Sequence, residues 1–154
     1  GRNAVYAAKT GWEAHAMDYS KVAKRKALEL AKQNQVEINY HTGDLADHEF
    51  DHLQFDLITL VYLHLPEHLR TVFHHKLIGL LKPGGFLFMQ AFSKEQVNYG
   101  SGGPKNLAML YHPDQILEDF SGLKTLDLGQ EEIDLEEGPH HRGTASNITF
   151  IGQK

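Results

Sequence analysis

The chain has 154 residues, of which 41% are hydrophobic, including 8 Phe and 6 Tyr, so it can bury the core of one domain. Its formal net charge is −5 and its Lys and Arg residues form no long block, which argues against a protein that binds the nucleic-acid backbone. It has no Cys, which excludes disulfides and thiolate metal sites, and no apolar run approaches the roughly 18–20 residues of a membrane span.

The first third of the chain predicts helices and strands in alternation. Asn3 can cap a first helix that stops at Gly11, and Ser20 can cap a second helix that is rich in good helix formers. The strand between the two helices runs into Asp18. The expected elements are a helix, a strand, a helix and a strand over residues 4–10, 13–17, 21–35 and 36–41.

The rest of the chain continues the alternation and ends in a hairpin. The run over residues 55–63 is mostly apolar, which is typical of a strand covered on both faces. Residues 98–106 are rich in Gly, and we expect them to form a mobile lid together with residues 107–111. The expected elements are a strand, a helix, a strand, a helix and two closing strands over residues 55–63, 66–81, 86–92, 113–120, 123–135 and 145–154.

This order indicates an α/β fold, with a doubly wound, mostly parallel sheet, helices on both faces and an antiparallel C-terminal strand. We expect a single cytoplasmic domain over residues 1–154; the oligomeric state is not predicted. A strand should precede the first helix, and the sequence does not contain one. Because the first strand of such a sheet lies at its centre, we expect that an upstream helix or two and one strand are absent from the sequence.

Carboxylates follow two neighbouring strands of this predicted sheet. Ligands of open α/β sheets bind beyond the carboxyl ends of the strands, where Asp18 and Asp44 are expected, with Gly1 in the loop before the first helix. An acidic residue after the second strand commonly accepts from two ribose hydroxyls, and one after the third can accept from an adenine amine. The three residues together favour a cofactor that contains adenosine. Taken alone, each has a simpler reading, since Asp18 could be a solvated strand end.

Five stretches of the sequence resemble the class I S-adenosylmethionine-dependent methyltransferases, and most of all the TehB-like, tellurite-resistance group. They are "GRNAVYAA", "AMDYS", "GDL", "FDLI" and "LLKPGGFL". The resemblance covers nearly the whole chain and implies a Rossmann-like fold and S-adenosylmethionine as the cofactor.

The resemblance also implies cofactor-binding residues in the first third of the chain. Gly1 resembles the last glycine of the loop that passes under the methionine part of the cofactor. Asp18 resembles the ribose-binding acid, with Tyr19 beside the adenine. Asp44 resembles the acceptor for the adenine amine, and Leu45 would pack on the ring. The helix start that belongs to this set is Gly1, Arg2 and Asn3.

Later residues complete the implied site. Val61 and Tyr62 would close over the cofactor, and His64 would face the methyl group or the acceptor. His141 would be a base and Arg142 would hold an anionic acceptor or oxyanion, because TehB-like proteins resemble this chain in placing a His-Arg pair there. His64 has a simpler reading as a helix-capping or solvent-facing residue, which the sequence favours. The pair can equally be part of a polar hairpin loop.

Three functions stay open at this point. The first is methyl transfer to a small molecule such as a thiol or a metalloid oxyanion, held in a buried pocket. The second is an NAD(P)-dependent Rossmann oxidoreductase, since Asp18 also fits its ribose-binding acid, and the third is a non-catalytic module that binds an adenosine cofactor. No metal site is expected, because the 11 His residues show no ligand spacing and the adjacent pairs at 74–75 and 140–141 read as surface residues.

Overall fold

A computed structural model describes residues 1–44, 50, 54–136, 138 and 141–154. Its helices and strands alternate in the predicted order, with two additional short 3-10 helices, η1 (Lys94–Asn98) and η2 (Leu107–Met109). The chain forms two compact units, Gly1–Glu49 and Phe50–Lys154, and a single domain over residues 1–154 stays a prediction. Within the described ranges, no helix is both long and apolar enough to span a membrane.

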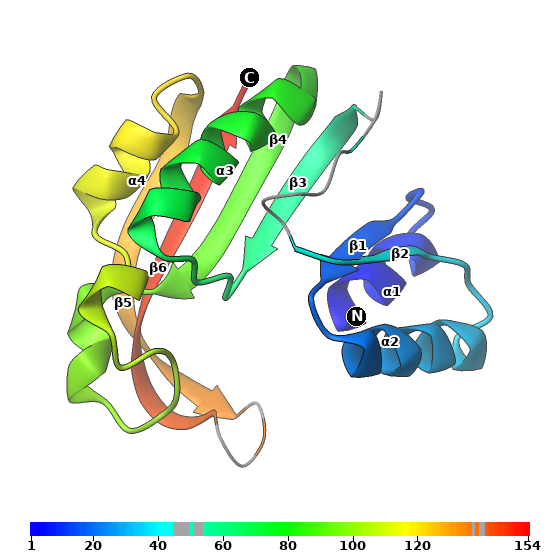
Figure 1. Ribbon diagram of the computed structural model, residues 1–154, viewed down its shortest axis with the longest axis horizontal. Coiled ribbons are helices and arrows are strands. Elements are labelled where there is room, and N and C mark those ends of the chain that lie inside the picture. The colour runs from blue at the N-terminus through cyan, green and yellow to red at the C-terminus, as the bar shows by residue number, and fades with distance from the viewer. Residues whose placement is uncertain (45–49, 51–53, 137, 139–140) are drawn as a thin grey trace. The chain divides into compact units, whose positions relative to one another are not determined.

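The first unit packs α2 against a two-stranded parallel sheet, and α1 packs against α2 (Figure 1). In β1 and β2, Asp18 lies opposite Thr42 at the carboxyl ends of the strands. Since parallel strands end at the same edge of a sheet, the residues that follow β1 and β2 meet at one edge. The elements are α1 (Arg2–Lys9), β1 (His15–Asp18), α2 (Lys21–Gln33) and β2 (Asn39–Thr42).

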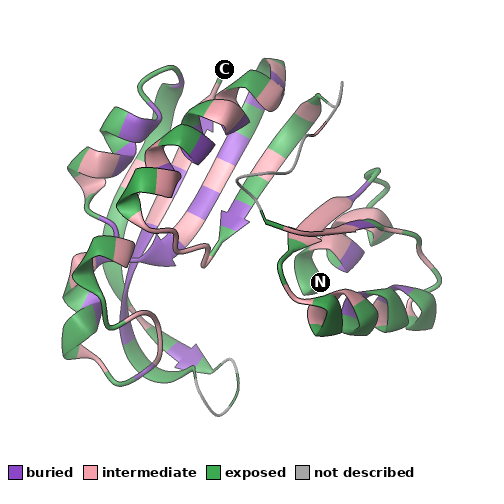
Figure 2. Cartoon of the chain, viewed as in Figure 1, coloured by how far each residue is buried: buried purple, intermediate pink, exposed green. Residues whose placement is uncertain are grey.

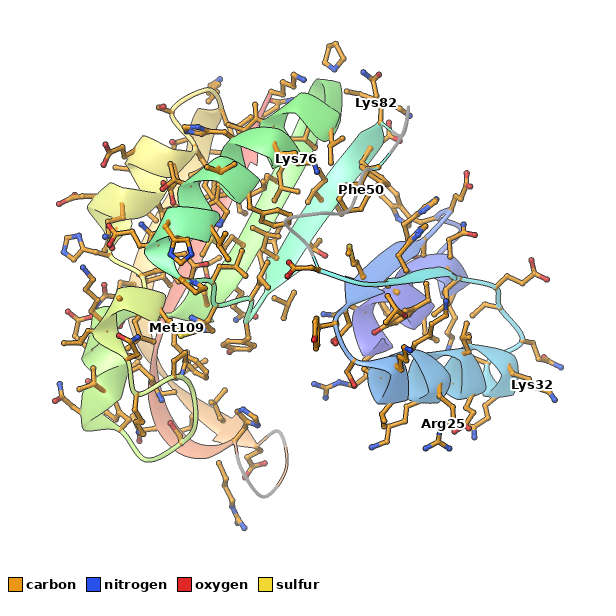
Figure 3. The ribbon with its side chains drawn as sticks, in the orientation of Figure 1. Arg25, Lys32, Phe50, Lys76, Lys82 and Met109 are labelled. Carbon is orange, nitrogen blue, oxygen red and sulfur yellow. The ribbon has the colours of Figure 1, made fainter. Side chains whose placement is uncertain are left out.

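Ser20 begins α2 as predicted. Its hydroxyl accepts a hydrogen bond from the Ala23 N–H at 3.2 Å, which satisfies one of the free donors of the first turn. The helix buries the small side chains of Ala27 and Ala31, and its long basic side chains, such as Arg25, point outward (Figure 3). The absence of bulk on the inner face lets α2 approach the rest of the unit closely.

The predicted cap of the first helix is wrong. Gly1 is the N-cap residue, no side chain caps the helix, and Asn3 lies inside α1. The Gly1 carbonyl already accepts a hydrogen bond from the Val5 N–H at 3.0 Å, so the helical ladder starts before Asn3. Asn3 therefore cannot adopt the extended backbone of a capping residue.

The second unit is a four-stranded mixed sheet with two helices over one face (Figure 1). The strand order is β3-β4-β6-β5; β3 and β4 are parallel, and β6 is antiparallel to both of its neighbours. This confirms the antiparallel strand pair that closes the chain. The elements are β3 (Phe55–Val61), α3 (Glu67–Leu80), β4 (Leu81–Phe92), α4 (Pro113–Asp119), β5 (Lys124–Glu136) and β6 (Arg142–Gln153).

The core of this unit lies between the sheet and the helices α3 and α4. Buried and partly exposed residues alternate along β4, and Leu87 and Met89 are fully buried (Figure 2). Phe120, which ends α4, stacks on Phe150 of β6 with ring centroids 5.2 Å apart. The aromatic contact joins the helical layer to the middle of the sheet.

The apolar run of β3 predicted a strand covered on both faces, and this prediction is wrong. Leu57 and Val61 of β3 and Phe86 of β4 are 39%, 38% and 39% exposed. They share one face, because strand side chains alternate and Leu57 lies opposite Phe86, and α3 and α4 cover the other face. The apolar run thus indicated that this face of β3 is hydrophobic, but not that another element packs on it.

Candidate functional site

Asp18 and Asp44 lie at one edge of the first unit's sheet, where the sequence placed them. Asp18 is the last residue of β1, and Asp44 follows the last residue of β2 by two positions. Both residues are exposed. Asp18 is in register with Thr42, so Asp44 lies two residues beyond the backbone position opposite Asp18.

The carboxylate of Asp18 is oriented by the backbone that follows it. Its Oδ1 accepts a hydrogen bond from the Ser20 N–H at 2.7 Å. Oδ2 has no hydrogen-bond partner among the residues that the structure describes. Burial, and then the charge of Asp18, raises the pKa of the Tyr40 hydroxyl. Asp18 is therefore held in place and still has an oxygen to offer a ligand.

A hollow of about 490 Å³ opens at this edge. The hydroxyl oxygen of Thr42 is buried there and has no partner within the described part of the chain. Tyr19 is 81% exposed, so its ring can stack on a planar ligand. An aromatic ring thus borders the hollow, and the carboxylates of Asp18 and Asp44 lie at the same sheet edge without lining it. The lining residues are Tyr19, Ser20, Lys21, Thr42 and Gly43.

Gly1 packs against α2 so tightly that a side chain would not fit. A Cβ at this position would lie 2.3 Å from the Cβ of Ala27, far inside van der Waals contact. Arg2 and Asn3 follow in the first turn of α1, where backbone N–H groups lack partners inside the helix and favour anionic ligands. The structure thus explains a glycine at position 1; cofactor binding by Gly1, Arg2 and Asn3 stays a prediction.

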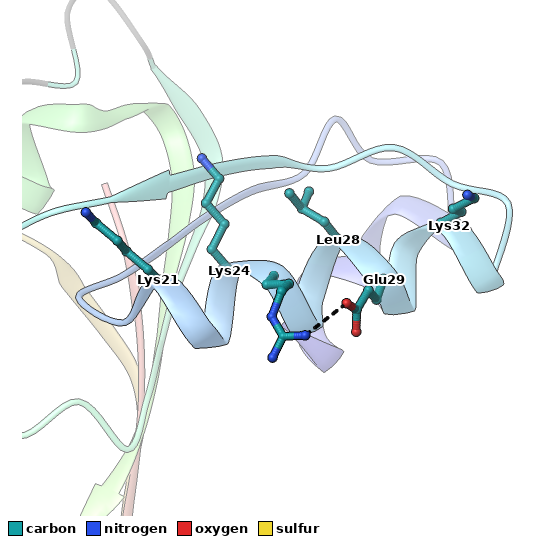
Figure 4. A pocket seen from close by; sticks show the side chains of 6 residues that line it. Lys21, Lys24, Leu28, Glu29 and Lys32 are labelled. Atoms are coloured by element: carbon teal, nitrogen blue, oxygen red, sulfur yellow. Dashed lines mark hydrogen bonds and ion pairs between the residues drawn. The ribbon is translucent and has the colours of Figure 1, made fainter.

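A second hollow, of about 480 Å³, follows the outer face of α2 (Figure 4). Arg25 and Glu29 form an ion pair across one helical turn, with Nη1 and Oε1 3.4 Å apart. All the walls come from the long, solvated side chains of a single helix, so we assign no ligand site to it. The lining residues are Lys21, Lys24, Arg25, Leu28, Glu29 and Lys32.

In the second unit, Val61 and Tyr62 lie at the carboxyl end of β3. Val61 is the last strand residue, and Tyr62 follows with a φ of 51°, which is rare for a residue with a side chain. The Tyr62 N–H donates to the Gln90 carbonyl at 2.7 Å, and its ring packs on Phe92 with centroids 4.6 Å apart. Backbone strain of this kind gathers at functional turns, although the predicted closure over a cofactor stays a prediction.

His64 is more enclosed than a solvent-facing residue would be. Its Nδ1 lies 2.8 Å from the carbonyl oxygen of Met109, which is labelled in Figure 3, and its Nε2 lies 3.4 Å from the backbone nitrogen of Phe92. Burial lowers the pKa of His64, against the opposite effect of the Met109 carbonyl. The predicted contact with a methyl group or an acceptor stays a prediction.

His141 and Arg142 lie where the β5–β6 hairpin turns, and both are exposed. Arg142 is the first residue of β6, in register with Glu136, and its guanidinium has no ion-pair partner among the described residues. The His141 N–H donates to the Gly138 carbonyl at 3.1 Å. The buried pocket expected around these two residues is therefore wrong, because both side chains face solvent. Their catalytic roles stay predictions, and Leu45 lies outside the described residues.

A buried polar cluster that the sequence did not predict lies between α3 and α4. Asp119 accepts hydrogen bonds from Arg70 Nε at 3.0 Å, from Thr71 Oγ1 at 3.0 Å and from His74 Nδ1 at 2.8 Å. His74 is fully buried, so reading it as a surface residue was wrong. Arg70 and His74 are four residues apart on one helix face, and this spacing was the available signal.

Burial and these hydrogen bonds together shift the pKa values of Asp119 and His74. Burial alone would raise the pKa of Asp119, but the hydrogen bonds from His74 and Thr71 and the charge of Arg70 outweigh it and lower that pKa. Burial lowers the pKa of His74, so its ring is neutral and donates from Nδ1. Across the described part of the chain, no three His, Asp or Glu side chains are arranged to hold a metal ion.

The glycine-rich loop expected as a mobile lid has buried anchors. Gln96 is fully buried; its amide nitrogen donates to Ser101 Oγ at 3.1 Å and its amide oxygen accepts from the Ser146 N–H at 2.8 Å. Ser101 Oγ donates to the Thr144 carbonyl at 2.6 Å. These contacts fasten the first half of the loop to β6.

Comparison with known proteins gives a family. The family described as methyltransferase domain matches residues 1–85, which is more than half of the chain. A comparison with curated protein sequences finds no match.

Solved structures give the fold. TehB from Haemophilus influenzae superposes with a TM-score of 0.80 at 15% identity, over 100% of this chain and 54% of that chain. An S-adenosylmethionine-dependent methyltransferase from Methanosarcina mazei has a TM-score of 0.73 at 15% identity, over 97% and 85%. The N-methyltransferase NodS from Bradyrhizobium japonicum, in complex with S-adenosyl-L-homocysteine, has a TM-score of 0.65 at 13% identity, over 91% and 65%. These likenesses confirm the Rossmann-like α/β fold, and this chain spans about half the length of TehB.

Proposed function

Because this chain belongs to the methyltransferase domain family, we propose that it transfers a methyl group from S-adenosylmethionine to a small molecule. The observation that carries the proposal is the edge of the first unit's sheet. There the Asp18 carboxylate is fixed by the Ser20 N–H and keeps one oxygen without a partner in the described residues, beside the buried hydroxyl of Thr42. These polar groups fit a nucleoside.

Different residues of the first unit would bind the ribose, the adenine and the methionine part of the cofactor. Asp18 would accept hydrogen bonds from the ribose hydroxyls, as acids after the second strand of such sheets do. The exposed ring of Tyr19 would lie against the adenine, and Asp44 would accept from its amine. Gly1 would let the backbone pass close to the methionine part of the cofactor, with the first turn of α1 behind it.

S-adenosylmethionine, when bound, supplies a methyl group that its sulfonium makes electrophilic. The work left to the protein is to align the acceptor, exclude water and take up a proton where the acceptor has one to lose. In the second unit the Tyr62 ring offers an aromatic face, which favours a cation. His141 would take the proton, because its imidazole can do so near neutral pH.

We propose a small, anionic acceptor, such as a thiolate or a metalloid oxyanion. Arg142 supports this class, since its guanidinium is exposed and unpaired among the described residues. A guanidinium binds oxyanions through two parallel N–H donors, which a lysine cannot reproduce.

Binding of S-adenosylhomocysteine, measured by calorimetry against NAD as the competing dinucleotide, tests the cofactor. We expect binding of S-adenosylhomocysteine by the wild-type chain, none of NAD, and loss of binding in Asp18→Ala. Preference for NAD would overturn the proposal in favour of an oxidoreductase.

A non-catalytic adenosine-binding module is the second candidate, and two observations favour it. Both ring nitrogens of His64 already have partners, and His141 is exposed. Turnover with a panel of thiols, selenite, tellurite and small amines separates the two candidates. Binding of the cofactor without methylation of any of these acceptors would support the module.

A further inference from the structure

The partners of His64 fix its protonation state. The Met109 carbonyl oxygen can only accept a hydrogen bond, and the Phe92 N–H can only donate one. The ring must therefore carry its proton on Nδ1 and its lone pair on Nε2. A neutral ring in this tautomer satisfies both partners at once, and no other form does.

The Phe92 N–H lies at a position where β3, if it were longer, would supply a hydrogen-bond acceptor. The Gln90 carbonyl accepts from the Tyr62 N–H at 2.7 Å, so at Gln90 the β4 backbone faces β3. Phe92 is two residues farther along and faces the same side, where β3 has already ended at Val61. His64 Nε2 thus takes the place of the strand acceptor that is missing there, and its side chain extends the ladder by one hydrogen bond.

Aromatic packing holds the ring in this plane. His64 stacks on the Phe92 ring at 5.6 Å with an interplanar angle of 12°, and the Tyr111 ring lies 5.5 Å away. The Tyr111 hydroxyl donates to the Leu63 carbonyl at 2.8 Å, so the same turn is held from a second side. The titratable group that faces His64 is Tyr111; the guanidinium of Arg70 and the ring of His74 lie beyond it, against the Tyr111 ring.

We infer that His64 is a positioning residue, whose neutral ring fastens the strained turn carrying Tyr62 to the end of β4 and to Met109. A ring whose lone pair is bonded to the Phe92 N–H cannot take a proton from an acceptor without giving up that bond. Acid would protonate Nε2, set two N–H donors against each other and release the turn. The role of His64 rests on the proposed function only in the experiment that measures cofactor affinity.

Long-range proton–nitrogen correlation on the 15N-histidine-labelled chain tests the tautomer without any ligand. At pH 7 we expect the His64 ring, assigned by its absence in His64→Asn, to be neutral with its proton on Nδ1. A proton on Nε2, or a charged ring at pH 7, would overturn the inference.

Hydrogen exchange and cofactor affinity test the positioning. We expect faster exchange of the Phe92 amide in His64→Phe, which keeps the stacking but neither hydrogen bond. In His64→Asn the amide nitrogen can still donate to Met109, so the Phe92 amide should exchange more slowly than in His64→Phe. His75→Phe, at an exposed site on α3, should leave the exchange of the Phe92 amide unchanged.

Affinity for S-adenosylhomocysteine should fall by about two- to tenfold in His64→Phe, as for the loss of a hydrogen bond. As the pH falls, the affinity of the wild-type chain should weaken more steeply than the affinity of His64→Phe. Unchanged exchange and affinity in His64→Phe would overturn the inference. If the wild-type chain binds no S-adenosylhomocysteine, the proposed function fails, while the tautomer and the exchange rates still decide the role of His64.

Discussion

The two units place their polar side chains in opposite ways. In the first unit the carboxylates of Asp18 and Asp44 are exposed at a sheet edge, and a backbone N–H orients Asp18. In the second unit Asp119 is buried with Arg70 and His74, and both of these side chains donate hydrogen bonds to its carboxylate. The same residue types are therefore exposed at a sheet edge in one unit and hold helices together in the other.

The difference follows from the cost of burying charge. An exposed carboxylate keeps its hydration until a ligand replaces it, so its removal costs the fold little. A buried carboxylate has lost that hydration and depends on its partners, so its removal leaves an uncompensated charge. Exposure separates the candidate binding residues of this chain from its structural ones better than residue type does.

The largest effect expected is that of Asp119→Ala, which leaves Arg70 buried without its partner. We expect a loss of about 3–5 kcal/mol in the free energy of unfolding of the second unit. Hydrogen exchange of amides in α3 and α4 measures it, while the single tryptophan, Trp12, reports on the first unit by fluorescence.

A matched double variant sharpens this prediction. Asp119→Leu combined with Arg70→Met removes both charges and keeps apolar volume, so it should recover much of the stability. A double variant as unstable as Asp119→Ala would show that the cluster contributes more than the mutual compensation of its charges.

The next effect is that of Asp18→Asn on cofactor affinity. The amide oxygen can still accept from the Ser20 N–H, but it lacks the charge that strengthens bonds to two ribose hydroxyls. We expect binding of S-adenosylhomocysteine to weaken by about 10- to 100-fold, from the loss of about 1.5–3 kcal/mol of charge-assisted hydrogen bonding. Calorimetry measures it, and an unchanged Trp12 melting curve shows that the first unit is intact. Equal affinity in both proteins would remove Asp18 from the site.

These contrasts also show what sequence reasoning can reach. The alternation of helices and strands, the Ser20 cap and the closing strand pair depend on local periodicity and turn chemistry, and all three were predicted. The edge position of Asp18 and Asp44 follows from topology alone, since residues after parallel strands share an edge.

The buried polar cluster could not be predicted in this way. Asp119 lies 45 residues after His74, and only the packing of α4 on α3 brings them together. His64 likewise meets Met109 from 45 residues away, and only the packing of the elements between them brings the two together. The exposed apolar face of β3 was missed because periodicity shows which residues are apolar and not what covers them.

Acid should destabilise the second unit through His74. Burial lowers the pKa of His74 in the folded protein, so below the unfolded value of about 6.5 the unfolded chain binds the proton more readily. The stability is complete above that pH and is lost as the pH falls through the lower, folded value. The lowered pKa of Asp119 acts in the same direction in stronger acid, below about pH 4.

Urea unfolding of the second unit between pH 7 and pH 5, followed by hydrogen exchange in α3, measures this loss. His74→Asn keeps a donor where Nδ1 stood and has no group that titrates, so its stability should change less over the same interval. An equal pH dependence in both proteins would assign the acid sensitivity to other groups.

The smallest effect on the fold is expected for Arg142→Ala, and this variant asks whether exposure marks a binding residue in the second unit too. Arg142 is exposed and makes no ion pair with the described residues, so the free energy of unfolding should change by less than about 0.5 kcal/mol. If Arg142 holds an anionic acceptor, KM for that acceptor should rise while the affinity for S-adenosylhomocysteine stays the same. Arg142→Lys keeps the charge but not the paired donors, and an intermediate KM would show that geometry contributes as well as charge. Unchanged KM in both variants would place the acceptor away from the hairpin and leave the first unit's edge as the binding surface for which the exposure rule holds.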